Sequence, residues 1–150
     1  MGKHHAIIIA QCFWVSKQKM QKGCKKMRKY YNKTGVLSEA TEQENVFMWT
    51  YYIPECEFMY AVPNGGTRNR IEAANLKRQG VRAGVPDIVL PVARKGFHGL
   101  YIEMKAKKGG KTSDDQKRYI EFLTENGYLA RVCKGAEEAV ALIKEYLDVE

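Results

Sequence analysis

The stretch GVPDIVLPVARKGFHGLYIEMK, residues 84–105, decides the fold. It holds two apolar runs of β-prone residues, Ile88-Val89-Leu90 and Leu100-Tyr101-Ile102, joined by a segment rich in glycine and charge. Such a segment is typical of a hairpin turn. The stretch therefore predicts two paired antiparallel strands, over 87–93 and 99–106.

Charged side chains occur inside this predicted hairpin, where apolar residues would be expected. Side chains alternate between the faces of a strand, so Glu103 and Lys105 share one face. A turn about Lys95-Gly96 sets Asp87 opposite residues 103–104. Two carboxylates and a lysine then converge, and carboxylate oxygens suit Mg²⁺ with room left for a phosphate ligand. The alternative is that Glu103 and Lys105 decorate a solvated strand face and that Asp87 is a turn residue.

Helix and strand signals flank the hairpin on both sides. Ser38 and Ser113 are predicted helix N-caps, and Ser113-Asp114-Asp115-Gln116 fits the S-x-x-Q capping box. Gly80 and Gly127 are predicted helix stops. The remaining predicted elements are helices over 39–51, 69–79, 113–126 and 136–147 and strands over 58–62 and 128–133.

The net charge of +8 is concentrated at the N-terminus. Residues 1–38 contain nine Lys or Arg and no acidic residue, whereas residues 39–150 contain sixteen basic and seventeen acidic residues. We interpret residues 1–37 as a basic arm and 38–150 as the folded domain. A basic run binds phosphate backbones, although a solvated tail or membrane attraction would produce the same pattern. The candidate DNA contacts are Lys25, Lys26 and Arg28 in the arm, and Arg68, Arg70, Lys77, Arg78 and Lys107 in the domain.

Several classes of protein are disfavoured by the composition. No apolar run approaches the roughly 18 residues of a membrane span, and the run 6–9 is too short for a secretory signal. The four cysteines form no C-x-x-C pair, so neither a zinc site nor a disulfide framework is indicated. We expect a cytoplasmic protein with reduced thiols and no membrane partner.

Several motifs in order resemble those of the VRR-NUC family of the PD-(D/E)xK nuclease superfamily. They are 81–87 (VRAGVPD), 101–105 (YIEMK), 113–116 (SDDQ) and 126–128 (NGY), with Pro63-Asn64-Gly65-Gly66 and 72–77 (EAANLK) upstream. The resemblance covers roughly residues 38–147. It implies an α/β fold with a restriction-endonuclease-like core, a central mixed β-sheet flanked by helices.

The resemblance also implies roles for individual residues. Asp87 and Glu103 would hold the metal, Mg²⁺ or Mn²⁺, and Lys105 would be the catalytic cation. An acidic residue of the first helix would join them, with Glu42 our first choice and Glu39 our second. Gln116 matches a glutamine near the active site, although an N3 glutamine in a capping box already has a structural role.

The function that follows is a metal-dependent DNA endonuclease of the phage or bacterial type, active in DNA repair. The resemblance implies branched DNA, a Holliday junction or a flap, as the substrate, and a homodimer as the working form. The alternative from another class is a non-catalytic DNA-binding module with a nuclease-like fold. A sequence-specific restriction enzyme is a third reading, which would usually need more chain for base recognition.

Overall fold

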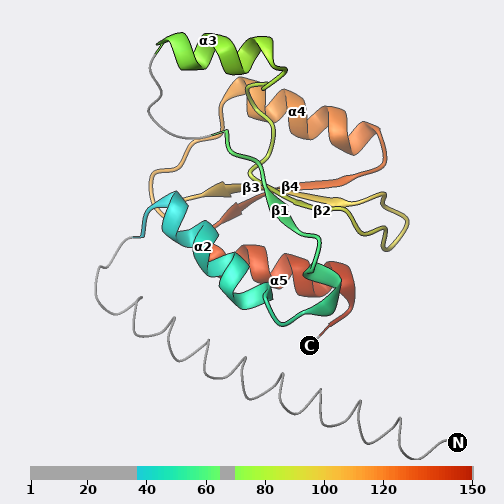
Figure 1. The fold of residues 1–150 in the computed structure, drawn as a ribbon. Coiled ribbons are helices and arrows are strands. Elements are labelled where there is room, and N and C mark those ends of the chain that lie inside the picture. The colour runs from blue at the N-terminus through green and yellow to red at the C-terminus, as the bar shows by residue number, and fades with distance from the viewer. Residues whose placement is uncertain (1–36, 65–69, 150) are drawn as a thin grey trace, which may run out of the picture.

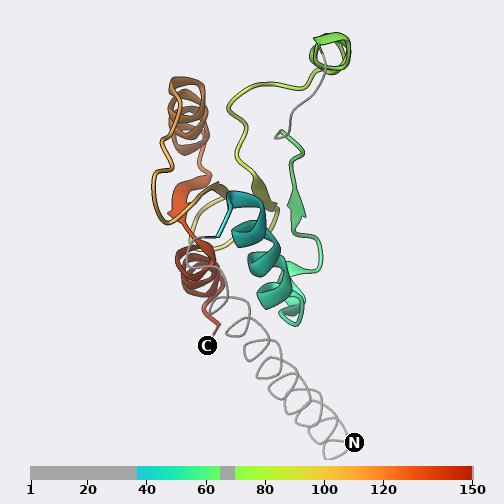
Figure 2. The ribbon, with the colours of Figure 1, turned by 90° about the vertical axis from the view of Figure 1, so that its left-hand side faces the viewer.

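The computed structural model describes residues 37–64 and 70–149. Within them, a four-stranded sheet in the order β1-β2-β3-β4 forms the centre. Helices α2 and α5 cover one face of the sheet, and α4 lies on the other (Figure 1). The helix α3 lies on the same side of the sheet as α4, apart from α4 and farther from the strands (Figure 2). The predicted α/β fold with a mixed sheet flanked by helices is confirmed.

The elements follow the predicted order closely. The helices are α2 (Glu39–Thr50), the 3-10 turn η1 (Pro54–Cys56), α3 (Arg70–Arg78), α4 (Asp114–Glu125) and α5 (Ala136–Leu147), and the strands are β1 (Tyr60–Ala61), β2 (Ile88–Leu90), β3 (Leu100–Lys105) and β4 (Leu129–Lys134). Ser38 and Ser113 both act as N-caps, and the capping box of Ser113 with Gln116 is complete. Gly80 and Gly127 adopt positive φ directly after their helices, as helix stops often do.

The central hairpin forms with a shorter first strand than predicted. Ile88 pairs with Ile102, so Asp87 lies beside residues 103–104 as expected. The turn occurs at Lys95-Gly96, where both residues have positive φ, the geometry of tight hairpins. The prediction that the first strand reaches residue 93 was wrong. The strand ends at Leu90 because Pro91 has no N–H to donate to the ladder.

The fourth strand, β4, pairs in parallel with β3 and aligns Glu103 with Val132. A parallel pair needs a crossover, and α4 supplies it between the two strands. The predicted strand over 58–62 is reduced to Tyr60–Ala61 at the sheet edge.

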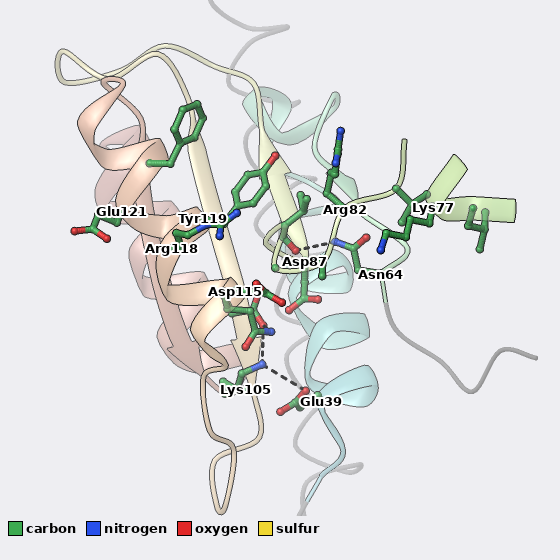
Figure 3. A pocket seen from close by; sticks show the side chains of 18 of the residues that line it. Glu39, Asn64, Lys77, Arg82, Asp87, Lys105, Asp115, Arg118, Tyr119 and Glu121 are labelled. Atoms are coloured by element: carbon green, nitrogen blue, oxygen red, sulfur yellow. Dashed lines mark hydrogen bonds and ion pairs between the residues drawn. The ribbon is translucent and has the colours of Figure 1, made fainter. Parts of the chain in front are cut away.

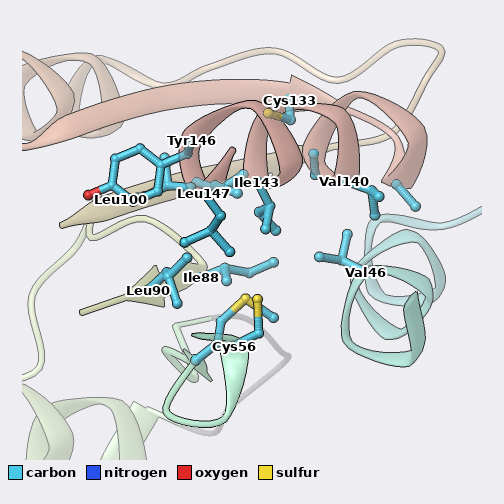
Figure 4. Packing of buried hydrophobic residues seen from close by; sticks show 14 of the residues in the cluster. Val46, Cys56, Ile88, Leu90, Leu100, Cys133, Val140, Ile143, Tyr146 and Leu147 are labelled. Carbon is cyan, nitrogen blue, oxygen red and sulfur yellow. The ribbon is translucent and has the colours of Figure 1, made fainter. Parts of the chain in front are cut away.

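The hydrophobic core lies between the sheet and the pair α2 and α5 (Figure 4). The even-numbered residues of β3, namely Leu100, Ile102 and Met104, point into it, and Ile143 of α5 is fully buried there. Each such side chain contributes about 1.5–3 kcal/mol by leaving water. The odd-numbered residues of β3 therefore point to the opposite face, toward α4.

The buried face of α2 is more polar than its sequence suggested. Val46 is fully buried, whereas Phe47 and Trp49 are only partly buried against the core. Glu42, Asn45 and Thr50 complete the buried face. The hydroxyl of Thr50 donates to the carbonyl of Val46, which satisfies it within the helix.

Candidate active site

A wide cleft opens on the α4 side of the sheet, with a cavity volume of about 1390 Å³. Pockets for small ligands usually measure about 300–1,000 Å³. The floor of the cleft is formed by the residues at the start of β2 and the end of β3, and the walls of the cleft come from α3 and α4. Asp87, Lys105 and Glu39 line the cleft (Figure 3), together with Glu103 and Gln116. The cleft is therefore large enough for a polymeric substrate.

Glu103 is the centre of the hydrogen-bond network on this floor. Its side chain is 1% exposed, and Oε1 accepts a 2.6 Å hydrogen bond from Lys105 Nζ and another from Gln116 Nε2. Its Oε2 is buried and has no hydrogen-bond partner among residues 37–64 and 70–149. A buried carboxylate oxygen without a partner is costly unless a ligand completes it.

The pKa of Glu103 reflects this environment. The pKa is raised to about 7: burial raises it most, the hydrogen bond from Lys105 lowers it, and the charge of the nearby Asp87 carboxylate raises it again. Near neutral pH the protein alone therefore holds Glu103 partly protonated. A divalent cation would compete with that proton for the carboxylate.

Asp87 is placed by the hairpin register. Its Oδ2 accepts a 2.8 Å hydrogen bond from the amide of Met104, across the strand pair. Burial raises the pKa of Asp87, and the Met104 amide and the charge of Lys105 offset only part of this rise. The carboxylates of Asp87 and Glu103 therefore lie near each other, at the end of the hairpin that is far from its turn.

Lys105 is buried, with 5% of its surface exposed. Burial alone would lower its pKa, but the hydrogen bond and charge of Glu103, followed by Glu39 and Asp87, outweigh it and raise the pKa. Its ammonium also donates to the carbonyl of Met104 at 2.9 Å. Lys105 therefore remains a cation at the cleft floor.

The two glutamates at the start of α2 have different surroundings. Glu39 lines the cleft, with Oε2 3.8 Å from Lys105 Nζ and Oε1 accepting from the amide of Ala106 (Figure 3). Glu42 is 1% exposed, and its Oε2 accepts a 2.8 Å hydrogen bond from the amide of Ala136 at the start of α5. Our first choice for the helix carboxylate, Glu42, thus lies outside the cleft lining, and the geometry favours Glu39.

Gln116 combines the two roles that its sequence position suggested. Its Oε1 accepts from the amide of Ser113 at 2.8 Å, which closes the capping box, while its Nε2 donates to Glu103. The cap thereby fixes the side chain that holds Glu103 Oε1. The structural and the active-site interpretations of Gln116 are compatible.

The predicted DNA contacts are distributed unevenly. Lys77 lines the cleft, whereas Arg78 is exposed outside its lining and Lys107 lies 2.9 Å from the carboxylate of Glu137. Lys25, Lys26, Arg28 and Arg68 and the side chain of Arg70 lie outside the described residues.

Sequence reasoning missed further residues of the cleft. Arg82 and Arg118 add positive charge, and Asn64 donates through Nδ2 to the carbonyl of Val85 at 2.8 Å. Arg82 stands within the VRAGVPD motif, so its position was a usable signal. Arg118 has no spacing that separates it from the other exposed charges of α4. Among the described residues, the charged groups that line the cleft are the carboxylates of Glu39, Asp87, Glu103, Asp115, Glu121 and Glu125 and the cations of Lys77, Arg82, Lys105 and Arg118.

The chain matches a known protein family. The family model of the VRR-NUC domain matches residues 17–137. The chain belongs to the VRR-NUC family. A solved structure described as a "VRR_NUC domain protein" is similar to it, with a TM-score of 0.67 and 33% identity, over 75% of this chain and 90% of that chain. No match was found among curated proteins.

Membership of the VRR-NUC family confirms the resemblance found in the sequence and implies a nuclease with DNA as its substrate. The match begins at residue 17, inside the predicted N-terminal arm, and the boundary near residue 37 stays a prediction. None of the described helices is long and apolar enough to span a bilayer.

Nucleases of the VRR-NUC family usually depend on a metal ion. Across residues 37–64 and 70–149, no three His, Cys, Asp or Glu side chains gather closely enough to hold one by themselves. The pair Asp87 and Glu103 nevertheless offers oxygen donors, including the partnerless Oε2 of Glu103. This donor set fits a hard cation such as Mg²⁺, which binds through one or two carboxylates and keeps several waters.

Proposed function

We propose that this VRR-NUC domain is a Mg²⁺- or Mn²⁺-dependent endonuclease that hydrolyses phosphodiester bonds in branched DNA, of the flap or four-way type. The observation that carries the proposal is the hydrogen bonding of the two carboxylate oxygens of Glu103. One of its oxygens is held by Lys105 and Gln116, and the other is buried without a partner beside Asp87.

In this proposal Asp87 and Glu103 hold the metal, which when bound polarises the phosphoryl oxygen and lowers the pKa of a water. The hydrogen bond from Met104 orients Asp87, and those from Lys105 and Gln116 orient Glu103. Because these partners are fixed before substrate arrives, little reorganisation is needed during the reaction.

Lys105 is proposed to stabilise the negative charge that develops on the phosphoryl group. An ammonium has three N–H donors, and two of those of Lys105 are used by Glu103 and the Met104 carbonyl. The remaining donor is available to a phosphate oxygen in the cleft. The raised pKa of Lys105 keeps its ammonium charged at neutral pH.

Glu39 is proposed as the helix carboxylate of the site, in place of Glu42. Glu39→Gln should lower the cleavage rate about 10- to 100-fold, the usual effect of removing a partner around a metal site. Glu42→Gln should leave the rate near wild type but lower the free energy of unfolding by about 1 kcal/mol, because its charge stabilises the N-terminus of α5. Cleavage rates and urea unfolding of both variants measure this difference, and the reverse pattern would restore Glu42 to the site.

Branched DNA and a homodimer belong to the proposal together, because symmetric incision of a four-way junction needs two active sites. Lys25, Lys26 and Arg28 of the arm, together with Arg68 and Arg70 of the nearly neutral domain, are proposed to supply phosphate contacts. Sedimentation of the full chain at micromolar concentration should show a dimer. A monomer that cuts flaps but not four-way junctions would contradict the junction-resolving form.

The direct test is cleavage of linear, flapped and four-way DNA of matched sequence with Mg²⁺, with Mn²⁺ or with EDTA. We expect cleavage of a branched DNA with either metal and none with EDTA. Salt-sensitive binding of all three DNAs without cleavage under any condition would favour the non-catalytic DNA-binding module instead.

A further inference from the structure

Two aromatic side chains of α4, Tyr119 and Phe122, line the cleft without serving the hydrophobic core. Their rings lie 6.3 Å apart between centroids at 72°. Phe122 is 56% exposed, whereas the neighbouring Leu123 is buried and attaches α4 to the sheet. A large exposed ring inside a functional cleft usually marks a contact with a ligand.

Tyr119 contacts Phe122, and further tyrosines lie near it. Tyr101 and Tyr128 are in edge-to-face contact at 5.3 Å. Burial raises the pKa of Tyr101, and the phenols of Tyr60, Tyr128 and Tyr119 raise it further. An aromatic ring that already contacts a neighbouring ring, as Tyr119 contacts Phe122, loses little conformational freedom when a flat ligand stacks on it.

The opposite wall of the cleft contains aliphatic side chains beside the basic Lys77 and Arg82. Leu76 of α3 and Val81 after it line the cleft, and Val81 is 37% exposed. The same cleft contains Glu103 and Lys105, so a chain bound at these walls is continuous with the proposed reaction centre. Paired aromatic and aliphatic walls suit the flat faces of a nucleobase.

The charges of the cleft favour an unpaired strand over a duplex as the occupant. Among the described residues of its lining, the acidic side chains outnumber the basic ones, so these residues offer little attraction to two phosphate backbones at once. A single strand needs phosphate contacts along one backbone only, and its bases supply the remaining affinity by stacking.

We propose that Tyr119 and Phe122 stack against an unpaired base next to the scissile phosphate, so that the cleft selects DNA with a single-stranded segment at the cut. The inference rests on the proposed DNA cleavage function and names the feature of a branched substrate that the site recognises.

The test measures how tightly wild type and Phe122→Ala bind two DNA probes in EDTA. EDTA removes divalent metal ions, so the proteins bind the DNA without cutting it. One probe is a flapped duplex with 2-aminopurine in the flap beside the junction, and the other is the fully paired duplex. Phe122→Ala should bind the flapped DNA about 5- to 100-fold more weakly, since stacking on one base contributes about that factor. Binding of the paired duplex should not change, and quenching of 2-aminopurine should be lost.

Further variants separate stacking from a general loss of apolar surface. Phe122→Trp should restore both affinity and quenching, whereas Phe122→Leu should not. Tyr119→Ala should repeat the effect of Phe122→Ala. The matched control is Phe58→Ala, because Phe58 is 72% exposed and lies outside the cleft lining.

An equal loss on both DNAs, or no loss on either, would overturn the stacking proposal. Loss of self-association with unchanged DNA binding would assign Phe122 to a contact between copies and overturn it too. Cleavage assays with Mg²⁺ keep the two proposals apart. If Phe122→Ala cuts flaps as wild type does, only the stacking proposal fails, and if wild type cuts no DNA, the nuclease proposal fails.

Discussion

Glu103→Gln is expected to lower the rate of metal-dependent DNA cleavage at least about 1000-fold, the largest effect of any single change in this domain. The amide keeps the size of the side chain and can still accept from Lys105 through its oxygen. It cannot supply an anionic Oε2, the atom that lies buried without a partner. The loss should therefore fall on metal binding and on the chemical step.

The matched control for this change is Glu121→Gln, which neutralises an exposed carboxylate of α4 in the lining of the same cleft. It should cut DNA at nearly the wild-type rate. Calorimetric titration with Mn²⁺ should show weakened binding for Glu103→Gln alone, and circular dichroism should show that both variants fold. Similar cleavage rates for wild type and Glu103→Gln would remove Glu103 from the reaction centre.

The central features of this site could be predicted from sequence because they depend on short-range rules. Strand alternation alone places Glu103 and Lys105 on one face of β3. The hairpin turn at Lys95-Gly96 fixes the register that brings Asp87 to the amide of Met104. The capping box identifies the start of α4 and thereby the position of Gln116. Each of these inferences spans one turn of helix or one hairpin.

The assignment of the helix carboxylate could not be made from sequence in the same way. Glu39 and Glu42 are three residues apart, and helical periodicity puts both on a similar side of α2. Which of them faces the cleft depends on how α2 packs on α5, where Glu42 accepts from Ala136, a residue 94 positions away. The polar buried face of α2 gave no hydrophobic stripe from which that orientation could be read.

The walls of the cleft were missed for a related reason. Tyr119 and Phe122 are partly or largely exposed, so a sequence pattern that seeks buried positions does not select them. That these two residues line a cleft is evident only once the structure places α3 and the segment containing Val81 on the opposite side of the cavity. Long-range placement of elements, rather than local propensity, determines which exposed aromatic residues meet a ligand.

Gly84→Ala is expected to lower the free energy of unfolding by about 3 kcal/mol or more, and to lower cleavage as well. Gly84 has a φ of 84°, a region that costs an L-residue about 1 kcal/mol. A Cβ there would also overlap the carbonyl of Asp115 and lie 2.9 Å from the backbone nitrogen of Gln116. Overpacking of this kind typically costs about 1–3 kcal/mol, because backbone atoms cannot move aside as a side chain can.

The control for the steric part is Gly96→Ala, because Gly96 has a φ of 83° and a Cβ there would meet nothing within 4 Å. Its unfolding free energy should fall by only about 1 kcal/mol, the conformational cost alone. Urea unfolding of the two variants measures the difference, and equal losses would show that the close approach of Gly84 to α4 contributes nothing. If the close approach of Gly84 to α4 matters, the Cβ added in Gly84→Ala should displace the segment around residue 84 and thereby shift Asp87 and Gln116. Gly84→Ala should then also slow cleavage, whereas Gly96→Ala should not.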